Sequence, residues 1–163
     1  MTGRRGAAAL EAALQRIGSG ALTGPFEQLI GYRCRWIEGA GLCVELDLDH
    51  RHTSQFGVAH GGVTLTLLDT VGGVATALEV EDLERIATIS FSANFIKAVP
   101  CGPVVATAVI HHLGRGVAHL SMELRAIGPT GHLLATGQGA YRLFRRDGTD
   151  ELNAGPATAV PPT

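Results

Sequence analysis

The chain has 163 residues, of which 45% are hydrophobic, and a formal net charge of −2 at pH 7. This length and composition suit a single domain with its own hydrophobic core. A charge this close to zero gives no reason to expect a nucleic acid or a membrane surface as partner. No apolar run is predicted to span a bilayer, and no continuous apolar segment follows the charged N-terminal residues. We therefore expect a cytoplasmic protein.

The cysteines give no sign of a disulfide framework or a metal site. The chain has 3 of them, Cys34, Cys43 and Cys101, without the spacing of metal ligands. An odd number argues against a closed set of disulfides. We expect all of them to be reduced, at small core or strand positions.

The first half of the chain predicts a helix, a linker and a strand. Residues 7–18 are rich in helix formers and end at a glycine, which is typical of a short helix. Gly24 and Pro25 break it, so residues 1–24 are predicted to form an N-terminal helix and linker. Apolar and polar residues alternate over residues 42–48, which predicts a half-buried strand. A loop over residues 49–59 follows.

A His-Gly-Gly turn at residues 60–62 opens a long apolar segment, residues 61–79. A segment that is apolar nearly all round is predicted to be a buried helix. The first N–H groups of a helix have no partner within it, and they favour a polarised carbonyl or an anion. Asp69 lies among leucines and valines of this helix, where an ionised carboxylate is costly unless it has a partner or a function.

Four further strands are predicted, over residues 86–96, 104–112, 117–126 and 133–144, with short turns between them. A strand, one long helix and a run of antiparallel strands is an α+β order, with the helix on one face of the sheet. The main domain is thus predicted to span residues 25–146. Residues 147–163 lack periodicity and are rich in Gly, Thr, Ala and Pro, so we expect a disordered tail.

These motifs resemble the hotdog-fold acyl-CoA thioesterases, specifically their phenylacetic-acid-degradation (PaaI-like) branch. The family motif fits in register at Gly57, His60, Gly61, Gly62 and Asp69. The resemblance continues to about residue 146 through residues 90–95, Pro100, Gly114, Arg115 and residues 131–139. It implies an antiparallel sheet wrapped around one long central helix. It also implies hydrolysis of an acyl-CoA thioester, with an aromatic or medium-chain acyl group and without a cofactor.

The spacing of Gly61 and Asp69 predicts self-association. A helix rises about 1.5 Å per residue, so they lie about 12 Å apart and cannot act on one carbonyl. If both are catalytic, Asp69 faces the Gly61 turn of a second copy, with the two helices antiparallel about a two-fold axis. The resemblance implies the same arrangement. We expect a homodimer, and a homotetramer of two dimers, because an isolated copy leaves a helix face and a sheet edge uncovered. Gly72 and Gly73 are costly in mid-helix, which suggests a close approach of backbones there.

The resemblance assigns roles to several of these residues. Asp69 is the nucleophile on the thioester or the base for the attacking water, and the residues do not decide between these roles. The N–H of Gly61, with Gly62 beside it, polarises the carbonyl. His60 is expected to orient the loop, with its ring bonded to the loop or to a substrate edge, and the alternative is that it carries a proton as a general base. Ser90 positions the water, or simply bonds to backbone as strand hydroxyls commonly do.

The sequence departs from the family motif at Ser54, where relatives have an asparagine. A carboxamide that helps to hold the carbonyl or the water is therefore missing. Gln55 is adjacent, but neighbouring side chains of an extended segment point in opposite directions. This departure keeps a non-catalytic acyl-CoA-binding protein open as an alternative function.

Contacts to CoA are expected from Asn94 near the pantetheine, and from Lys97 and Arg115, with Gly114 in the same turn, near the phosphates. The alternative is that these are ordinary solvated turn and edge residues. His111 and His112 are neighbours on a predicted strand and should face opposite sides, and no metal site is predicted. A hydratase or dehydratase acting on acyl thioesters is a further, weaker alternative, because the interval from His60 to Asp69 does not suit it.

Overall fold

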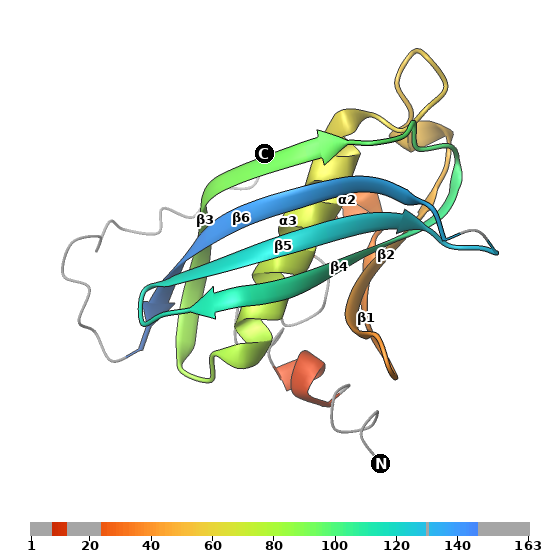
Figure 1. Ribbon diagram of the computed structural model, residues 1–163. Coiled ribbons are helices and arrows are strands. Elements are labelled where there is room, and N and C mark those ends of the chain that lie inside the picture. Colours follow the sequence, from red (N-terminus) through yellow and green to blue (C-terminus); the bar gives the residue numbers. More distant parts are fainter. Residues whose placement is uncertain (1–7, 13–23, 130, 147–163) are drawn as a thin grey trace, which may run out of the picture.

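The computed structural model describes residues 8–12, 24–129 and 131–146, and within them a six-stranded antiparallel sheet packs against one long helix (Figure 1). The elements in chain order are α2 (Pro25–Ile30), β1 (Arg33–Ile37), β2 (Gly41–Leu48), the 3-10 helix η1 (His50–His52), α3 (Gly61–Glu79), β3 (Leu83–Phe95), β4 (Gly102–Leu113), β5 (Val117–Ala126) and β6 (Leu133–Arg145). The strand order is β1-β2-β4-β5-β6-β3, so β1 and β3 are the edges. This is the predicted α+β architecture, with the sheet wrapped around α3.

Helix α3 provides the centre of the core. Leu67, Leu68 and Val71 are fully buried against inward-facing residues of the strands, such as Leu120 and Leu124. Contrary to the sequence expectation, α3 is long and apolar enough, by length and composition alone, to cross a membrane. Half of it is buried within the fold. Its apolar character is explained by the sheet that surrounds it.

The predicted strand at residues 42–48, the helix at residues 61–79 and the four later strands are all confirmed, with bounds shifted by a few residues. Besides the short 3-10 helix η1, which lies in the predicted loop, two elements were missed. Helix α2 begins at Pro25, which was interpreted as a breaker but occupies the first turn, where proline is tolerated. Strand β1 alternates exposed arginines with Cys34 and Trp36 and so carries little apolar signal. Residues 8–12 are helical, whereas the rest of the predicted N-terminal helix and the predicted tail lie outside the described residues.

The cysteines are free thiols. Cys34 and Cys43 are buried, and burial raises the pKa of Cys34 to about 11, which keeps this thiol protonated. Cys101 is exposed in the loop before β4, unlike the core or strand position expected from the sequence.

Two β-bulges change which side chains share a face of the sheet. The register between β3 and β6 shifts between Thr88 and Ser90, and the register between β4 and β5 shifts between Ile110 and His112. A bulge inserts one extra residue, so side chains beyond it swap faces relative to simple alternation. The second shift falls at the two histidines, His111 and His112, that the sequence analysis had assigned to opposite faces.

Candidate active site

Short-range hydrogen bonds shape the loop between β2 and α3. The Asp49 carboxylate accepts from the Arg51 N–H at 2.9 Å, and hydrogen bonds from the Arg51 side chain hold the pKa of Asp49 down at about 2. The buried His52 ring accepts from the Asp49 N–H at 3.0 Å and bonds through Nε2 to the Ile30 carbonyl at 2.8 Å. The His52 carbonyl in turn accepts from the His60 N–H at 2.8 Å. The residue that precedes α3 is therefore held in place by hydrogen bonds to this loop.

The turn at the start of α3 leaves one backbone donor free. His60 is the N-cap, and its Nδ1 accepts from the Gly62 N–H at 3.0 Å. The Val63 N–H bonds to the His60 carbonyl at 3.0 Å. No acceptor for the Gly61 N–H exists among the residues that the structure describes. Of the two expected donors, only Gly61 can thus polarise a carbonyl, because Gly62 is used by the histidine cap.

One apolar side chain, Phe95, borders the glycine that carries this free donor. A Cβ at Gly61 would lie 3.4 Å from the Phe95 ring, at the end of β3. Phe95 is 55% exposed and Ile96 is 48% exposed. The surface beside the donor is therefore suited to an apolar group attached to the carbonyl.

Asp69 lies further along α3, partly buried, with its carboxylate turned toward β3. Its Oδ1 accepts from the Thr88 hydroxyl at 2.9 Å. A charge-assisted hydrogen bond of this kind fixes one carboxylate oxygen and leaves the other for chemistry. At about 1.5 Å per residue along the helix, Gly61 and Asp69 are about 12 Å apart, so one chain does not bring them together.

Ser90 is not beside Asp69. Thr88 pairs with Tyr141, an inward-facing residue, whereas Ser90 pairs with Ala140 beyond the β3 bulge. Ser90 is exposed and lines a shallow depression on the outer face of the sheet with His119 and Gln138. The hydroxyl next to the acid therefore belongs to Thr88, two residues before the Ser90 that the family resemblance suggested.

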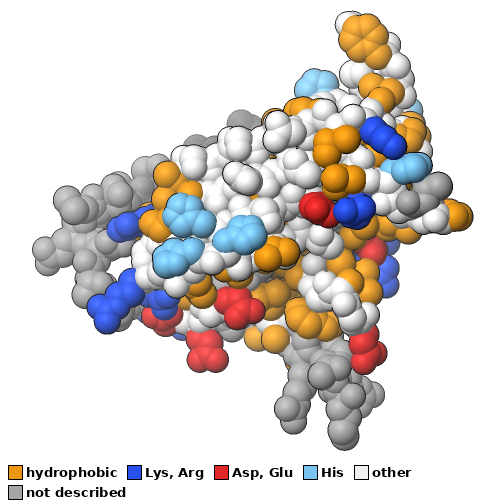
Figure 2. All heavy atoms as spheres, viewed as in Figure 1, with side chains coloured by type: hydrophobic (Ala, Val, Ile, Leu, Met, Phe, Trp, Pro, Cys, Tyr) orange, Lys and Arg blue, Asp and Glu red, His pale blue; other side chains and the backbone are white. Residues whose placement is uncertain are grey.

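The loop places Ser54 and Gln55 differently. The Ser54 hydroxyl donates to the Val58 carbonyl at 3.2 Å and accepts from the Phe56 N–H at 3.3 Å, so it braces its own turn. Gln55 is exposed, and Phe56 beside it is 78% exposed. The loop stands out from the rest of the molecule (Figures 1 and 2).

The residues expected to contact CoA lie at two ends of the sheet. Asn94 is exposed on β3, and the Lys97 N–H, just beyond β3, bonds to the Leu134 carbonyl at 3.1 Å, near the start of β6. Gly114 and Arg115 form the β4–β5 turn, where the Arg115 carbonyl accepts from Arg145 at the end of β6. The two groups lie at opposite ends of β6, and the rise per residue of a strand separates them by about 30 Å. Within one chain they cannot bind the same phosphates.

His111 and His112 face the same side of the sheet, which corrects the expectation of opposite faces. His111 bonds to the Ser121 hydroxyl at 2.7 Å, and the His112 ring lies 6.1 Å from the His119 ring. Figure 2 shows histidine side chains gathered on the sheet face turned away from α3. The bulge after Ile110 brings the two neighbours together. Within the described ranges, no three His, Cys, Asp or Glu side chains are placed to hold a metal ion.

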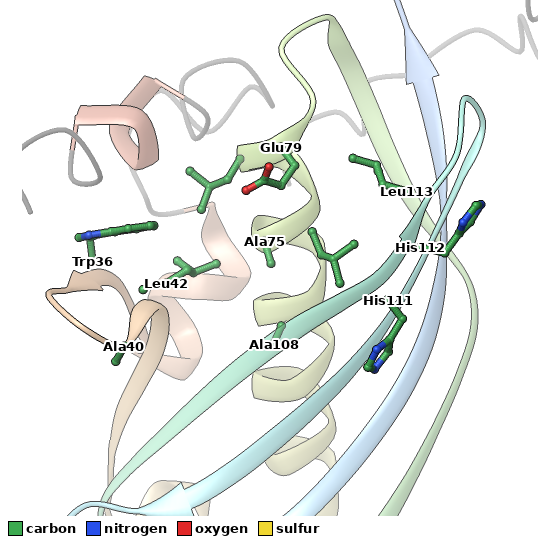
Figure 3. Close-up of a pocket in the computed structure, with 12 residues that line it drawn as sticks. Trp36, Ala40, Leu42, Ala75, Glu79, Ala108, His111, His112 and Leu113 are labelled. Atoms are coloured by element: carbon green, nitrogen blue, oxygen red, sulfur yellow. The ribbon is translucent and has the colours of Figure 1, made fainter. Parts of the chain in front are cut away.

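A pocket of about 520 Å³ lies on another side of α3, toward β1, β2 and β4 (Figure 3). Trp36 and Leu42 face Ala75 and Glu79 of the helix across it. None of the predicted catalytic residues is among its lining residues. The candidate site is instead the open surface where α3 and β3 run side by side.

The structure adds three residues that sequence reasoning missed: Thr88, His52 and Phe95. Thr88 could have been found only by locating the bulge, because it and Ser90 are both hydroxyl residues on one strand. His52 looked like one of several loop histidines. Phe95 reaches Gly61 only because β3 ends beside the start of α3.

Part of the chain matches a family of known proteins. Residues 56–131 match the family model described as Thioesterase superfamily. A Haemophilus influenzae protein named "Putative esterase" is 33% identical over 55% of this chain and 62% of its own length, so the match spans just under two thirds of that relative. An Escherichia coli protein named 1,4-dihydroxy-2-naphthoyl-CoA hydrolase is 28% identical over 63% of this chain and 72% of its own length.

Solved structures show the same fold. A thioesterase from Haemophilus influenzae superposes with a TM-score of 0.68, at 23% identity, over 76% of this chain and 85% of that chain. A Bacillus halodurans protein solved with CoA superposes with a TM-score of 0.71, at 20% identity, over 87% of this chain and 93% of that chain. The chain therefore has the hotdog fold, and its residues 56–131, which carry both the His-Gly-Gly turn and Asp69, match the Thioesterase superfamily.

Proposed function

We propose that this protein hydrolyses acyl-CoA thioesters at a site shared between two copies of the chain. One observation carries the proposal: the unused Gly61 N–H and the Thr88-bound Asp69 carboxylate lie on the same helix, about 12 Å apart. Two such helices placed antiparallel bring the donor of each copy to the acid of the other. Two equivalent sites result.

The edge strand β3 offers the surface for this pairing. Its outer edge has no partner strand among the described residues, and most of its side chains are exposed, including Ile89 and Phe95. A long unpaired apolar edge is a template for another strand. A second copy bound along β3 would continue the sheet and align the two α3 helices.

Contacts within one chain predict the register of that pairing. On β3, Thr88 lies beside Asp69 of α3, and Phe95 lies beside Gly61 of α3. Bringing the acid to the donor of the other copy thus places Thr88 of one strand near Phe95 of the other. Directly opposed residues of an antiparallel pair share a face, so the two-fold axis must pass through a residue position and not between two residues. The residues midway between Thr88 and Phe95 are Phe91 and Ser92, so the axis passes through one of these.

The chemistry follows from these positions. The Gly61 N–H polarises the thioester carbonyl and stabilises the negative charge that develops on its oxygen. Asp69 of the other copy either attacks the carbonyl carbon, giving an anhydride that water cleaves, or removes a proton from the attacking water. In both routes the CoA thiolate leaves, and Thr88 keeps the carboxylate oriented. The geometry is compatible with both routes.

The substrate assignment rests on charge and apolar surface. In the proposed register, the Lys97 end of β3 in one copy lies beside the Arg85 end of β3 in the other copy, near the turn that contains Arg115. Cations from both copies would therefore lie close together, where they could bind the phosphates of CoA. Phe95 and Ile96 would meet the acyl group, and an aromatic or medium-chain acyl group suits them. Hydrolases of an aromatic acyl-CoA among the relatives, and a neighbour solved with CoA, support this assignment.

Finer assignments extend the same proposal. We place the chain in the PaaI-like branch because of the His-Gly-Gly turn and the position of Asp69, and we propose a cytoplasmic homotetramer built from two dimers. A non-catalytic acyl-CoA-binding protein is the second candidate, favoured by one observation: the Ser54 hydroxyl is turned into its own loop and is not available to a substrate.

A panel of acyl-CoAs with a thiol reagent tests the function. The proposal predicts release of free CoA, and predicts that Asp69→Asn lowers turnover more than tenfold, a barrier increase above about 1.4 kcal/mol. Amide and carboxylate have nearly the same shape, so folding and assembly should be unchanged. Binding of acyl-CoA without release of CoA would favour the second candidate, and a changed double bond would indicate a hydratase.

A further inference from the structure

A buried tyrosine hydroxyl reaches the helix turn that carries Asp69. Tyr141 on β6 is 1% exposed, and its hydroxyl donates to the main-chain oxygen of Asp69 at 3.2 Å. Within an α-helix that oxygen already accepts the N–H of the next turn. The tyrosine therefore supplies a second donor that the helix itself does not need. This bond ties one turn of α3 to the sheet.

Two glycines form the slot in which the tyrosine sits. A Cβ at Gly72 on α3 would collide with the Tyr141 hydroxyl oxygen, and a Cβ at Gly139 on β6 would lie 2.9 Å from the Tyr141 ring. Neither glycine has a positive φ, so the backbone conformation does not require glycine at either position. The close approach that the sequence suggested for Gly72 is made by this tyrosine ring of the same chain.

Tyr141 and Thr88 hold opposite ends of the same residue. They are direct partners in the register between β6 and β3. Thr88 binds the Asp69 carboxylate, and Tyr141 binds the Asp69 main chain. Two neighbouring strands thus fix both the helix turn and the orientation of the acid.

We propose that Tyr141, seated between Gly72 and Gly139, is a positioning residue that sets the Asp69 turn where Thr88 can orient the carboxylate. The inference rests on the proposed function, because it depends on Asp69 being the catalytic acid. Burial raises the pKa of Tyr141 far above its ordinary value, so its hydroxyl remains a donor throughout the working pH range. Tyr141 itself is buried behind α3 and acts only through Asp69.

Tyr141→Phe removes the hydroxyl and keeps the ring. Because misplacement of a catalytic group slows chemistry without weakening substrate binding, kcat should fall about tenfold while KM changes less than about twofold. Tyr32→Phe is the matched control. Tyr32 is also buried, and burial raises the pKa of its hydroxyl, which the side chains of Glu27 and of Thr70, the residue after Asp69 on α3, also influence. This control loosens the same helix turn but should leave kcat within about twofold of wild type.

An unchanged kcat in Tyr141→Phe, or equal losses in both variants, would overturn the inference. Failure of the proposed function is seen separately, as absence of turnover in the wild-type protein. In that case a crystal structure of Tyr141→Phe decides the positioning role. The inference predicts that the Asp69 carboxylate moves beyond about 3.5 Å from the Thr88 hydroxyl. A contact retained at the 2.9 Å of the native chain contradicts it.

Discussion

The hydroxyl of Thr88 donates to the Asp69 carboxylate at 2.9 Å. Thr88→Val removes this hydroxyl with little change in shape. A hydrogen bond to a charged group contributes about 1.5 to 3 kcal/mol, so kcat/KM should fall about tenfold or more. Ser90→Ala is the control, since Ser90 lies on the other face of the sheet, and it should leave kcat/KM unchanged. Steady-state kinetics with the best acyl-CoA measures both, and a larger loss in Ser90→Ala would reverse the assignment.

The loop before α3 offers a second test at single residues. Asparagine at position 54 can keep the bond to the Phe56 N–H that Ser54 now makes, and it adds an amide donor. Ser54→Asn should therefore raise kcat/KM several-fold, because one neutral hydrogen bond contributes about 0.5 to 1.5 kcal/mol. Gln55→Ala should have little effect. If Gln55→Ala abolishes activity while Ser54→Asn changes nothing, Gln55 has the role assigned to position 54.

At the scale of elements, α3 contains two adjacent glycines with different surroundings. Gly72 faces the Tyr141 hydroxyl, whereas a Cβ at Gly73 meets no atom within 4 Å. Gly72→Ala should lower the free energy of unfolding by about 1 to 3 kcal/mol despite the better helix propensity of alanine. Gly73→Ala should leave it unchanged or raise it by up to about 1 kcal/mol. Denaturant unfolding measures both, and equal stability of the two variants would contradict the packing described for Tyr141.

Elements and motifs differ in how far the sequence could predict them. The helix that carries the His-Gly-Gly turn and Asp69 could be predicted because the motif is local in sequence, and helix spacing alone gives the separation of the two features. Thr88 was missed because the resemblance pointed to Ser90, and no local signal marks the bulge that puts these two hydroxyls on different faces of β3. Tyr141 was missed because its bond to Asp69 joins residues far apart in the chain. Strand β1 was missed because its exposed face carries arginines.

At the scale of the whole molecule, the proposed pairing of β3 can be tested by cross-linking. In a background with the exposed Cys101 replaced by serine, Ser92→Cys lies near the proposed two-fold axis. Mild oxidation should link two chains through Cys at this position. Thr136→Cys, on the neighbouring strand β6, is one strand further from the edge and should not cross-link. A dimer that cross-links only at position 136 would show that β3 is not the interface.

The central claim is that each site takes its acid from one copy and its donor from the other. Gly61→Pro removes the free N–H at the first helical position, where proline is tolerated and where the extended His60 before it is compatible. Asp69→Asn removes the acid. Each variant alone should be inactive, and both should still assemble.

Mixing the two variants in equal amounts, after dissociation and reassembly, is the most direct measurement. A hybrid dimer would combine the Asp69 of one copy with the Gly61 N–H of the other, giving one intact site and one doubly defective site. With random pairing, hydrolysis should recover to about a quarter of the wild-type rate. No recovery in dimers shown by mass to be hybrids would contradict the shared site, because acid and donor would then act within one chain.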